Sequence, residues 1–260
     1  MTSGLDYNLF RPAILKCTNS NKNASTLDIV SCFAKDGILF EPGSLFNYSL
    51  SIDVVAAIIE IVSKMKFSEY VKRNIFDPLG MKNSTFKNDK SYSNKAIKDF
   101  FYSNGKLEKS SGNYEYFTVN DTYESGGAGL LSTVDDYSLF ISSLANDNRL
   151  LSNESIRKIS KIYVENTPFN KDVEEYSKSS EDYGYGYGVR VRKHESSFGI
   201  PEGEFGWDGA AGSYCLCDRK NGISITIGLN VLSWPSYVKD FHIKLANFIY
   251  FDLLKDAESK

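Results

Sequence analysis

Residue types that build most metal and redox sites are scarce in this chain of 260 residues, which has four cysteines and two histidines. Cys215 and Cys217 lie two residues apart in a predicted strand, so their side chains share a face. A metal pair there is weakly supported, because no second pair of cysteines or histidines lies nearby. We interpret the cysteines as small buried residues in a reducing compartment. His194 is expected in a solvated loop and His242 on a helix surface, so we expect no metal and no other cofactor.

An excess of charge of one sign is also lacking. The chain has 30 Lys and Arg against 33 Asp and Glu, a net charge of -3. This balance excludes the basic footprint that nucleic acids and anionic membranes require. The longest apolar run, residues 54–62, is interrupted by Glu60 and is too short to cross a bilayer. Residues 1–6 have neither the basic nor the apolar part of a signal peptide. We therefore expect a cytoplasmic globular protein with no nucleic-acid partner and no membrane segment.

The order of the predicted elements indicates an α+β fold in one domain over residues 1–260. Apolar periodicity predicts helices at 24–36, 51–64, 67–75, 134–146, 153–162 and 236–254. Strands are predicted at 185–192, 203–207, 213–218 and 222–231, with a hairpin turn at 218–222. Residues 82–120 have no firm period, so we interpret them as loops with at most one short helix, and residues 163–182 have the composition of a surface loop. We expect residues 1–182 to form a mainly helical subdomain, and residues 183–260 an antiparallel sheet with a C-terminal helix.

Two glycine-rich stretches have both a structural and a functional interpretation. Residues 126–129 (Gly-Gly-Ala-Gly) precede a predicted helix, as phosphate-binding loops do, but no Lys-Ser or Lys-Thr follows them. We favour a tight backbone crossing, followed by a helix that Ser132 or Thr133 caps. Residues 183–188 alternate tyrosine and glycine. This alternation is typical of a close-packed strand, since a base-stacking platform would need basic neighbours.

Two other segments are harder to explain by packing alone. In residues 40–60, a Pro-Gly turn leads to Tyr48 just before an apolar helix. This arrangement fixes a polar side chain at the rim of a cleft. In residues 205–214, Trp207, Asp208 and Gly209 are followed by small residues at the start of a strand. Such a run indicates that another group approaches the backbone closely.

Together with shorter motifs, these segments resemble the serine β-lactamase and penicillin-binding-protein superfamily. The likeness is strongest to its class C-like branch, which includes the family VIII carboxylesterases. The motifs occur in the family's order over nearly the whole chain, at residues 1–5, 40–60, 78–81, 126–136, 184–186 and 207–214. The resemblance implies a β-lactamase/transpeptidase-like fold and a small-molecule ester or amide substrate.

Members of that family form an acyl-enzyme through the serine of a Ser-x-x-Lys motif. By resemblance, Tyr48 corresponds to the tyrosine of a Tyr-x-Asn motif, which helps to move protons. Trp207, Asp208 and Gly209 correspond to the Lys/His-Thr-Gly element that closes the substrate pocket. The backbone N–H of Ala210 would then be one half of an oxyanion hole.

The chain departs from the family pattern in three places. Leu50 stands where the pocket has asparagine, and Trp207 stands where it has lysine or histidine. Both changes remove polar groups that hold a β-lactam, so an esterase-like ancestry is favoured. The family's Ser-x-x-Lys also lies upstream of the segment that matches residues 2–5. Such strings occur here only downstream of Tyr48, and we interpret them as chance matches. They begin at Ser63, Ser84, Ser103, Ser155 and Ser236.

We therefore predict that the chain lacks its own nucleophile and the N-terminal strands of the family's sheet, which would leave an unpaired strand edge. One hypothesis is a serine hydrolase, truncated or wrongly started, that is inactive alone. A second is a non-catalytic relative whose cleft binds cell-wall peptides or acyl compounds. A third is one half of a two-chain enzyme, completed by a separately encoded N-terminal polypeptide.

Overall fold

The computed structural model describes residues 1–9, 11–86, 91, 95, 97–110, 119–164, 182–232 and 241–258. The chain divides into two compact units. The first contains residues 1–96, 114–132 and 166–179, and the second contains residues 97–113, 133–165 and 180–260. Among the helices of the described ranges, none combines the length and apolar character that a membrane span requires.

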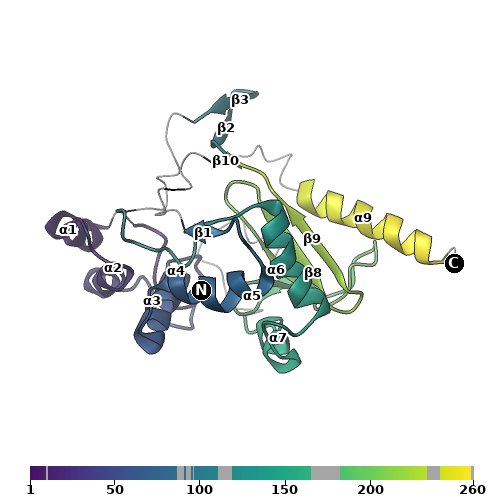
Figure 1. The fold of residues 1–260 in the computed structure, drawn as a ribbon, viewed down its shortest axis with the longest axis horizontal. Helices are drawn as coiled ribbons and strands as arrows, with labels where there is room; N and C mark the ends of the chain where they lie inside the picture. Colours follow the sequence, from purple (N-terminus) through teal and green to yellow (C-terminus); the bar gives the residue numbers. More distant parts are fainter. Residues whose placement is uncertain are drawn as a thin grey trace. The chain divides into compact units, whose positions relative to one another are not determined.

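The first unit is mainly helical, and the helices predicted at 24–36, 51–64 and 67–75 are present in it. Its elements are α1 (Pro12–Ser20), α2 (Thr26–Phe33), η1 (Ala34–Asp36), α3 (Ser51–Ser63), α4 (Phe67–Val71), η2 (Lys72–Phe76), α5 (Asp77–Leu79), β1 (Thr85–Phe86) and β4 (Leu130–Leu131). Ser25 begins α2 with a reciprocal capping box to Asp28. The sequence did not predict α1, which starts with a proline in its first turn. Helices α2 and α4 pack beside α3 (Figure 1).

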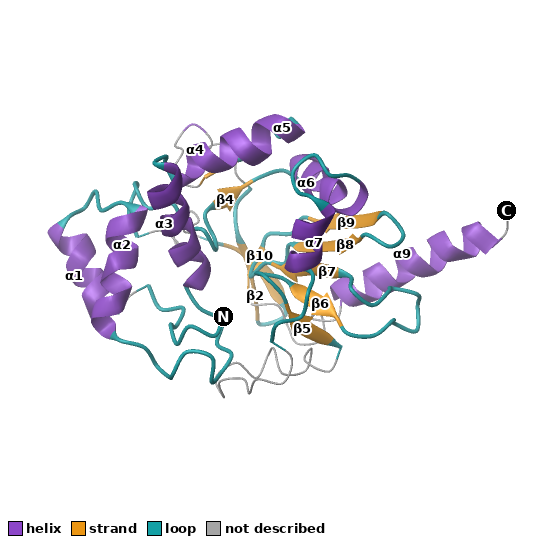
Figure 2. Ribbon diagram, turned by 90° about the horizontal axis from the view of Figure 1, so that it is seen from below, coloured by secondary structure: helices purple, strands orange, loops and turns teal. Residues whose placement is uncertain are grey.

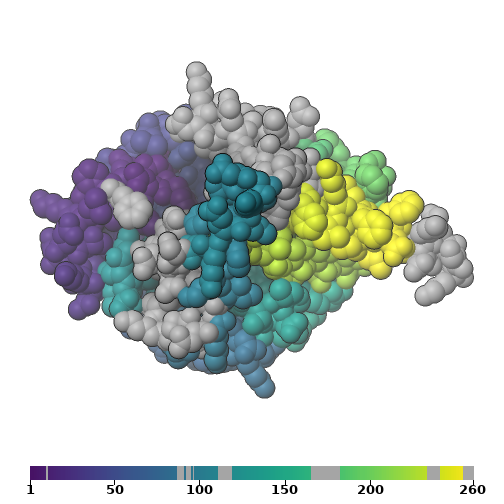
Figure 3. Space-filling model, turned by 90° about the horizontal axis from the view of Figure 1, so that it is seen from above, coloured from purple at the N-terminus to yellow at the C-terminus, as the bar shows by residue number. Residues whose placement is uncertain are grey.

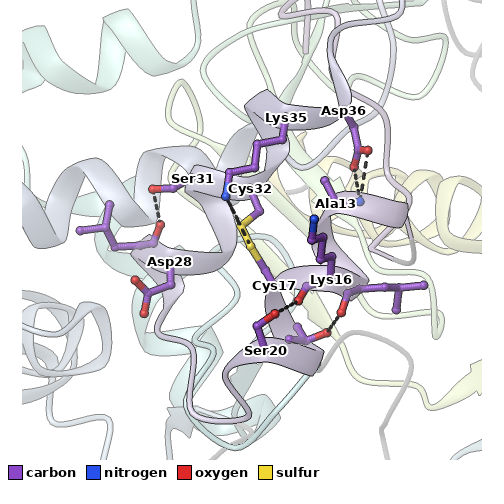
Figure 4. Close-up of a disulfide and its surroundings, with 12 residues drawn as sticks. Ala13, Lys16, Cys17, Ser20, Asp28, Ser31, Cys32, Lys35 and Asp36 are labelled. Atoms are coloured by element: carbon purple, nitrogen blue, oxygen red, sulfur yellow. Dashed lines mark hydrogen bonds between the residues drawn. A yellow bond between two sulfur atoms is a disulfide. The ribbon is translucent and has the colours of Figure 1, made fainter.

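A disulfide joins α1 to α2 in this unit. Cys17 and Cys32 are bonded, with their Cα atoms 6.6 Å apart, and Lys35 Nζ lies 3.7 Å from Cys32 Sγ (Figure 4). The expectation of reduced cysteines is therefore wrong for this pair. No local pattern indicates this pairing, because the two cysteines lie on different helices, one of which was not predicted. Cys215 and Cys217 are free and buried, as expected.

Loss of this disulfide is expected to destabilise the first unit by about 3 kcal/mol, because it closes a loop of 15 residues and so restricts the unfolded chain. Urea unfolding of a Cys17→Ser/Cys32→Ser variant, followed by far-UV circular dichroism, measures the loss. Dithiothreitol should destabilise the natural chain equally and leave the double variant unchanged. Equal stability of the oxidised and reduced chains would contradict the prediction.

The second unit contains the sheet. Its elements are β2 (Phe100–Ser103), β3 (Lys106–Lys109), α6 (Val134–Asn146), α7 (Asn153–Ile159), β5 (Tyr183–Tyr185), β6 (Arg190–Arg192), β7 (Phe205–Asp208), β8 (Tyr214–Asp218), β9 (Ile223–Ile227), β10 (Val231–Leu232) and α9 (Phe241–Glu258). Strands β5 to β9 form one antiparallel sheet in sequence order. A second sheet has the order β10-β2-β3, in which β10 is parallel to β2. This mixture of helices and an antiparallel sheet confirms the predicted α+β class.

Alternation along β8 explains how the sheet is covered. Cys215 and Cys217 pack in one cluster with residues of α6, whereas Leu216 packs in another with Ala246 and Tyr250 of α9. The helices α6 and α9 thus cover opposite faces of the sheet (Figure 2). Figure 3 shows much of α9, in yellow, on the surface. Among the described strands, β9 pairs only with β8 and forms an edge of the sheet.

Several predicted elements need correction. The strand expected at 185–192 is two strands, β5 and β6, with a tight turn that includes Gly188 at φ 78°. The strand expected at 222–231 ends at Ile227, and β10 joins the other sheet. Strands also occur within 82–120, which was expected to lack them. Most of the predicted surface loop at 163–182, and the first residues of the helix predicted at 236–254, lie outside the described residues.

Candidate functional site

Tyr48 lies on the approach to α3, in the first unit. The predicted Pro-Gly turn is present, with Gly43 at φ 88°, a value that favours glycine. The Tyr48 side chain is partly buried, and its ring stacks on that of Tyr7 with centroids 5.2 Å apart. Its neighbours on both sides are buried: Asn47 donates to the Leu5 carbonyl at 2.8 Å, and the hydroxyl of Ser49 hydrogen-bonds to that of Ser51. These anchors fix the backbone on either side of Tyr48.

Leu50 immediately precedes α3 and belongs to the core of the first unit. Its side chain is 4% exposed and packs in one cluster with Ile14, Phe33 and Tyr123. An asparagine at this position would bring an amide into an apolar cluster, which costs free energy unless the amide finds partners. The predicted contribution of Leu50 to a substrate pocket stays a prediction.

The first turn of α3 is held by a polar network that the sequence did not predict. Asp53, which is 1% exposed, accepts hydrogen bonds from the hydroxyls of Tyr123 and Ser125, both at 2.6 Å. Burial, reinforced by the Asp53 carboxylate, raises the pKa of Tyr123, so this tyrosine remains a donor. A Cβ on Gly126 would lie 2.6 Å from the Ile52 carbonyl oxygen. The glycine cluster at 126–129 is thus the tight backbone crossing that we favoured, and Thr133, not Ser132, caps α6.

The other predicted site residues lie together at the end of β7, in the second unit. Trp207 is partly buried and contacts Tyr185 edge to face, with ring centroids 5.4 Å apart. A tight loop follows, in which Gly209 N–H donates to the Ser213 carbonyl at 2.7 Å. Ala210 is exposed at the tip of this loop. In the described part of the chain, no group accepts a hydrogen bond from its N–H. This N–H is therefore available to an external acceptor.

Asp208 is fixed by a buried guanidinium group. Arg190, which is 8% exposed, donates to Asp208 Oδ1 at 3.0 Å and to the Cys215 carbonyl at 3.1 Å. Its guanidinium also lies 3.6 Å from Oε1 of the buried Glu204 carboxylate, and Arg192 contacts the Oε2 of the same group. Burial raises the pKa of Glu204, and the two arginines counteract the rise in part. The cluster joins the ends of β6, β7 and β8.

His242 requires a correction. It was expected as a helix-surface residue, but it is partly buried, and its ring stacks on Tyr214 with centroids 5.0 Å apart. Its Nε2 hydrogen-bonds to the Gly212 carbonyl at 2.8 Å, so α9 contacts the loop that contains Ala210. Burial lowers the pKa of His242. His194 is exposed, as expected.

The structure thus describes two groups of predicted site residues, each within its own unit. Tyr48 and Leu50 precede α3 in the first unit, and residues 207–210 end β7 in the second. One of the Ser-x-x-Lys strings lies on α7, where Lys158 pairs with Glu154 across one helical turn. Within the described ranges, no group of three or more His, Cys, Asp or Glu residues could hold a metal ion.

Comparison with known proteins finds one matching family and several solved structures with a similar fold. Residues 1–246 match the family described as Beta-lactamase. A stretch of 69 residues is 33% identical to Protein flp of Staphylococcus aureus (strain MW2), which corresponds to 26% of this chain and 14% of that protein.

The fold neighbours include a hydrolase with promiscuous acyltransferase activity, a simvastatin synthase and a penicillin-binding protein. EstCE1, a hydrolase with promiscuous acyltransferase activity, has a TM-score of 0.67 at 21% identity over 89% of this chain and 65% of its own. The LovD6 mutant of simvastatin synthase from Aspergillus terreus has a TM-score of 0.74 at 20% identity over 98% of this chain and 64% of its own. A penicillin-binding protein from Bacillus halodurans has a TM-score of 0.67 at 18% identity over 94% of this chain and 70% of its own. The chain therefore spans about two thirds of the length of these neighbours.

Proposed function

Because the chain belongs to the Beta-lactamase family, we propose that it forms the proton-transfer and oxyanion-binding part of an esterase-like serine hydrolase. In this proposal the reaction passes through an acyl-enzyme, and the serine nucleophile belongs to the part of the fold that residues 1–260 do not cover. The chain alone is then inactive towards small ester and amide substrates.

The exposed N–H of Ala210 is the observation that carries the proposal. It lies at the tip of the loop after β7 and has no acceptor in the described part of the chain. An N–H held in this way can stabilise the oxyanion that develops when a carbonyl is attacked. Arg190 and His242 fix the loop from two sides, through Asp208 and the Gly212 carbonyl. Such preorganisation is what an oxyanion hole needs.

Two further features support the esterase-like assignment. The aliphatic side chain of Leu50 has no polar atom, and the indole of Trp207 is neutral, so they do not reproduce the amide and the positive charge of the asparagine and the lysine of β-lactam-hydrolysing relatives. EstCE1, one of the fold neighbours, is a hydrolase with promiscuous acyltransferase activity. Both features favour acyl transfer from an uncharged ester.

The location of the nucleophile is testable with a fluorophosphonate probe, which reacts with activated serines. We expect no covalent labelling of the chain alone, because its Ser-x-x-Lys strings all lie downstream of Tyr48. We expect labelling once the part of the fold that only the longer neighbours contain is supplied, whether in the same chain or as a separate polypeptide. Labelling of the chain alone at the rate seen with the completed fold would overturn the proposal.

A Tyr48→Phe variant tests the role of the tyrosine in the completed enzyme. Loss of a group that transfers protons is expected to lower kcat for p-nitrophenyl acetate by about 10²-fold or more, with little effect on KM. Tyr7→Phe is the matched control, because Tyr7 stacks on Tyr48 and the replacement keeps the ring. Equal kcat values in the two variants would show that the Tyr48 hydroxyl takes no part in proton transfer.

A further inference from the structure

The disulfide between α1 and α2 joins a partly exposed cysteine to a buried one. Cys17 on α1 is partly buried, whereas Cys32 on α2 is 2% exposed. Lys35 extends its ammonium group towards both sulfurs, with Nζ 3.7 Å from Cys32 Sγ and 4.0 Å from Cys17 Sγ (Figure 4). Lys35 is itself exposed. The bond therefore combines one approachable sulfur with a cation beside the other.

This geometry determines how the disulfide reacts with a thiol. In thiol–disulfide exchange, a thiolate attacks one sulfur and the other sulfur leaves as a thiolate. The difference in burial favours attack at Cys17 Sγ, so Cys32 Sγ leaves next to the Lys35 ammonium group. A neighbouring cation stabilises a thiolate, and a stabilised thiolate leaves faster. Lys35 is thus placed to accelerate opening of this bond.

Helix α1 depends on the disulfide for its attachment at the C-terminal end. A helix of nine residues is marginal by itself, so it needs contacts with its neighbours. Ile14 is its one buried residue, and near the N-terminal end the Asp36 carboxylate accepts from the Ala13 N–H at 3.2 Å. None of residues 15–20 is buried. Opening of the disulfide therefore releases the C-terminal half of α1.

The segment that precedes α1 contacts the approach to α3. Tyr7 stacks its ring on that of Tyr48, with centroids 5.2 Å apart. Leu9 packs in one core cluster with Ile14 of α1 and with Leu50. Because such a cluster is close-packed, a displacement of α1 changes the packing of the residues beside Tyr48.

We propose that Cys17 and Cys32 form a reversible thiol–disulfide switch that controls the position of Tyr48. The thiolate of a small-molecule thiol bonds to Cys17 Sγ, and the electron pair of the broken S–S bond goes to Cys32 Sγ. A second thiolate attacks the sulfur of the bound small molecule, which leaves as its own disulfide and releases the Cys17 thiolate. The protein gains two electrons, and its thiolates take up protons from water. Reoxidation restores the bond. The consequence for activity rests on the proposed function.

The rate of reduction by glutathione tests the reactive site. Iodoacetamide traps the free thiols of the natural chain at successive times, and mass spectrometry counts them. Lys35→Met should slow reduction by about threefold or more, whereas Lys35→Arg keeps the charge and should react nearly as fast as the natural chain. Lys22→Met is the matched control, because Lys22 is an exposed lysine between α1 and α2. Equal rates in Lys35→Met and Lys22→Met, or no reduction by excess glutathione, would overturn the proposal.

Hydrogen exchange, followed by mass spectrometry on this chain alone, tests the connection to Tyr48. Reduction should increase exchange by about tenfold or more at residues 11–20 and 47–50, and leave α6 in the second unit unchanged. A Cys17→Ser/Cys32→Ser variant should exchange like the reduced chain with or without thiol. Unchanged exchange at residues 47–50 would overturn the switch, whatever the activity of the completed enzyme. Increased exchange there, with full activity in Tyr48→Phe, would support the switch and contradict the proposed function.

Discussion

Replacing Arg190 with methionine is expected to lower the free energy of unfolding of the second unit by about 3–5 kcal/mol, the usual cost of removing one partner from a buried ion pair. The guanidinium joins Asp208, Glu204 and the Cys215 carbonyl, and the Glu204 side chain has no exposed surface. Without Arg190, the described residues leave this carboxylate one ion-pair partner, Arg192, at 3.4 Å. Tryptophan fluorescence during urea unfolding measures the effect, because both tryptophans of the chain belong to this unit.

A matched control tests whether the loss of unfolding free energy depends on the burial of the arginine. Arg149→Met removes an exposed arginine that pairs with Asp147 at 2.8 Å, and it should cost less than about 1 kcal/mol. A double variant, Arg190→Met/Glu204→Gln, should recover part of the loss because it also removes the buried charge. Equal losses in Arg149→Met and Arg190→Met would contradict the account.

The pH dependence of the Arg190→Met variant follows from Glu204. Burial already raises the pKa of Glu204 above its ordinary value of 4.5, and loss of a neighbouring cation raises it further. A carboxyl whose pKa is raised by folding contributes stability that is present below its unfolded pKa and is lost as the pH rises through the folded value. The loss of unfolding free energy in Arg190→Met, relative to the natural chain, should therefore be larger at pH 7 than at pH 4.5. A deficit independent of pH would mean that the Glu204 charge is not its cause.

Local signals explain which elements were predictable from the sequence. Helix α6 was predicted with the observed bounds, because Thr133 caps it and an apolar period continues to Asn146. The hairpin of β2 and β3 was missed although its signal is present. Asn104 and Gly105 form the two-residue turn, both with positive φ, which is typical of a hairpin. The parallel pairing of β10 with β2 joins residues that are 131 positions apart in the sequence, such as Phe100 and Val231, and no local pattern predicts such a contact.

The candidate site was predictable only as motifs. The Pro-Gly turn, Tyr48 and the end of β7 have local signatures, so the sequence located them. The side chains that hold these motifs in place have no such local signature. Arg190 and Glu204 are charged, and no local pattern indicates that the sheet buries them together. His242 read as a helix-surface residue because its contact with the Gly212 carbonyl spans 30 residues.

Asp53→Ala is expected to destabilise the first unit by about 3–5 kcal/mol. The carboxylate is buried, and its loss leaves the hydroxyls of Tyr123 and Ser125 without their acceptor. Each unsatisfied buried hydroxyl costs about 1–3 kcal/mol, and a cavity adds to this. The loss is measured by urea unfolding, followed by far-UV circular dichroism, because the first unit contains no tryptophan.

Asp53→Asn is the matched variant that separates hydrogen bonding from charge. The amide oxygen can accept from one hydroxyl and the amide N–H can donate to the other, so a loss of only about 1 kcal/mol is expected. A loss in Asp53→Asn as large as that in Asp53→Ala would show that the negative charge, rather than the hydrogen bonds, stabilises the first turn of α3. Since Tyr48 lies just before this turn, Asp53→Ala should also increase hydrogen exchange at residues 47–50. Unchanged hydrogen exchange at these residues would show that the Asp53 network does not hold the backbone around Tyr48.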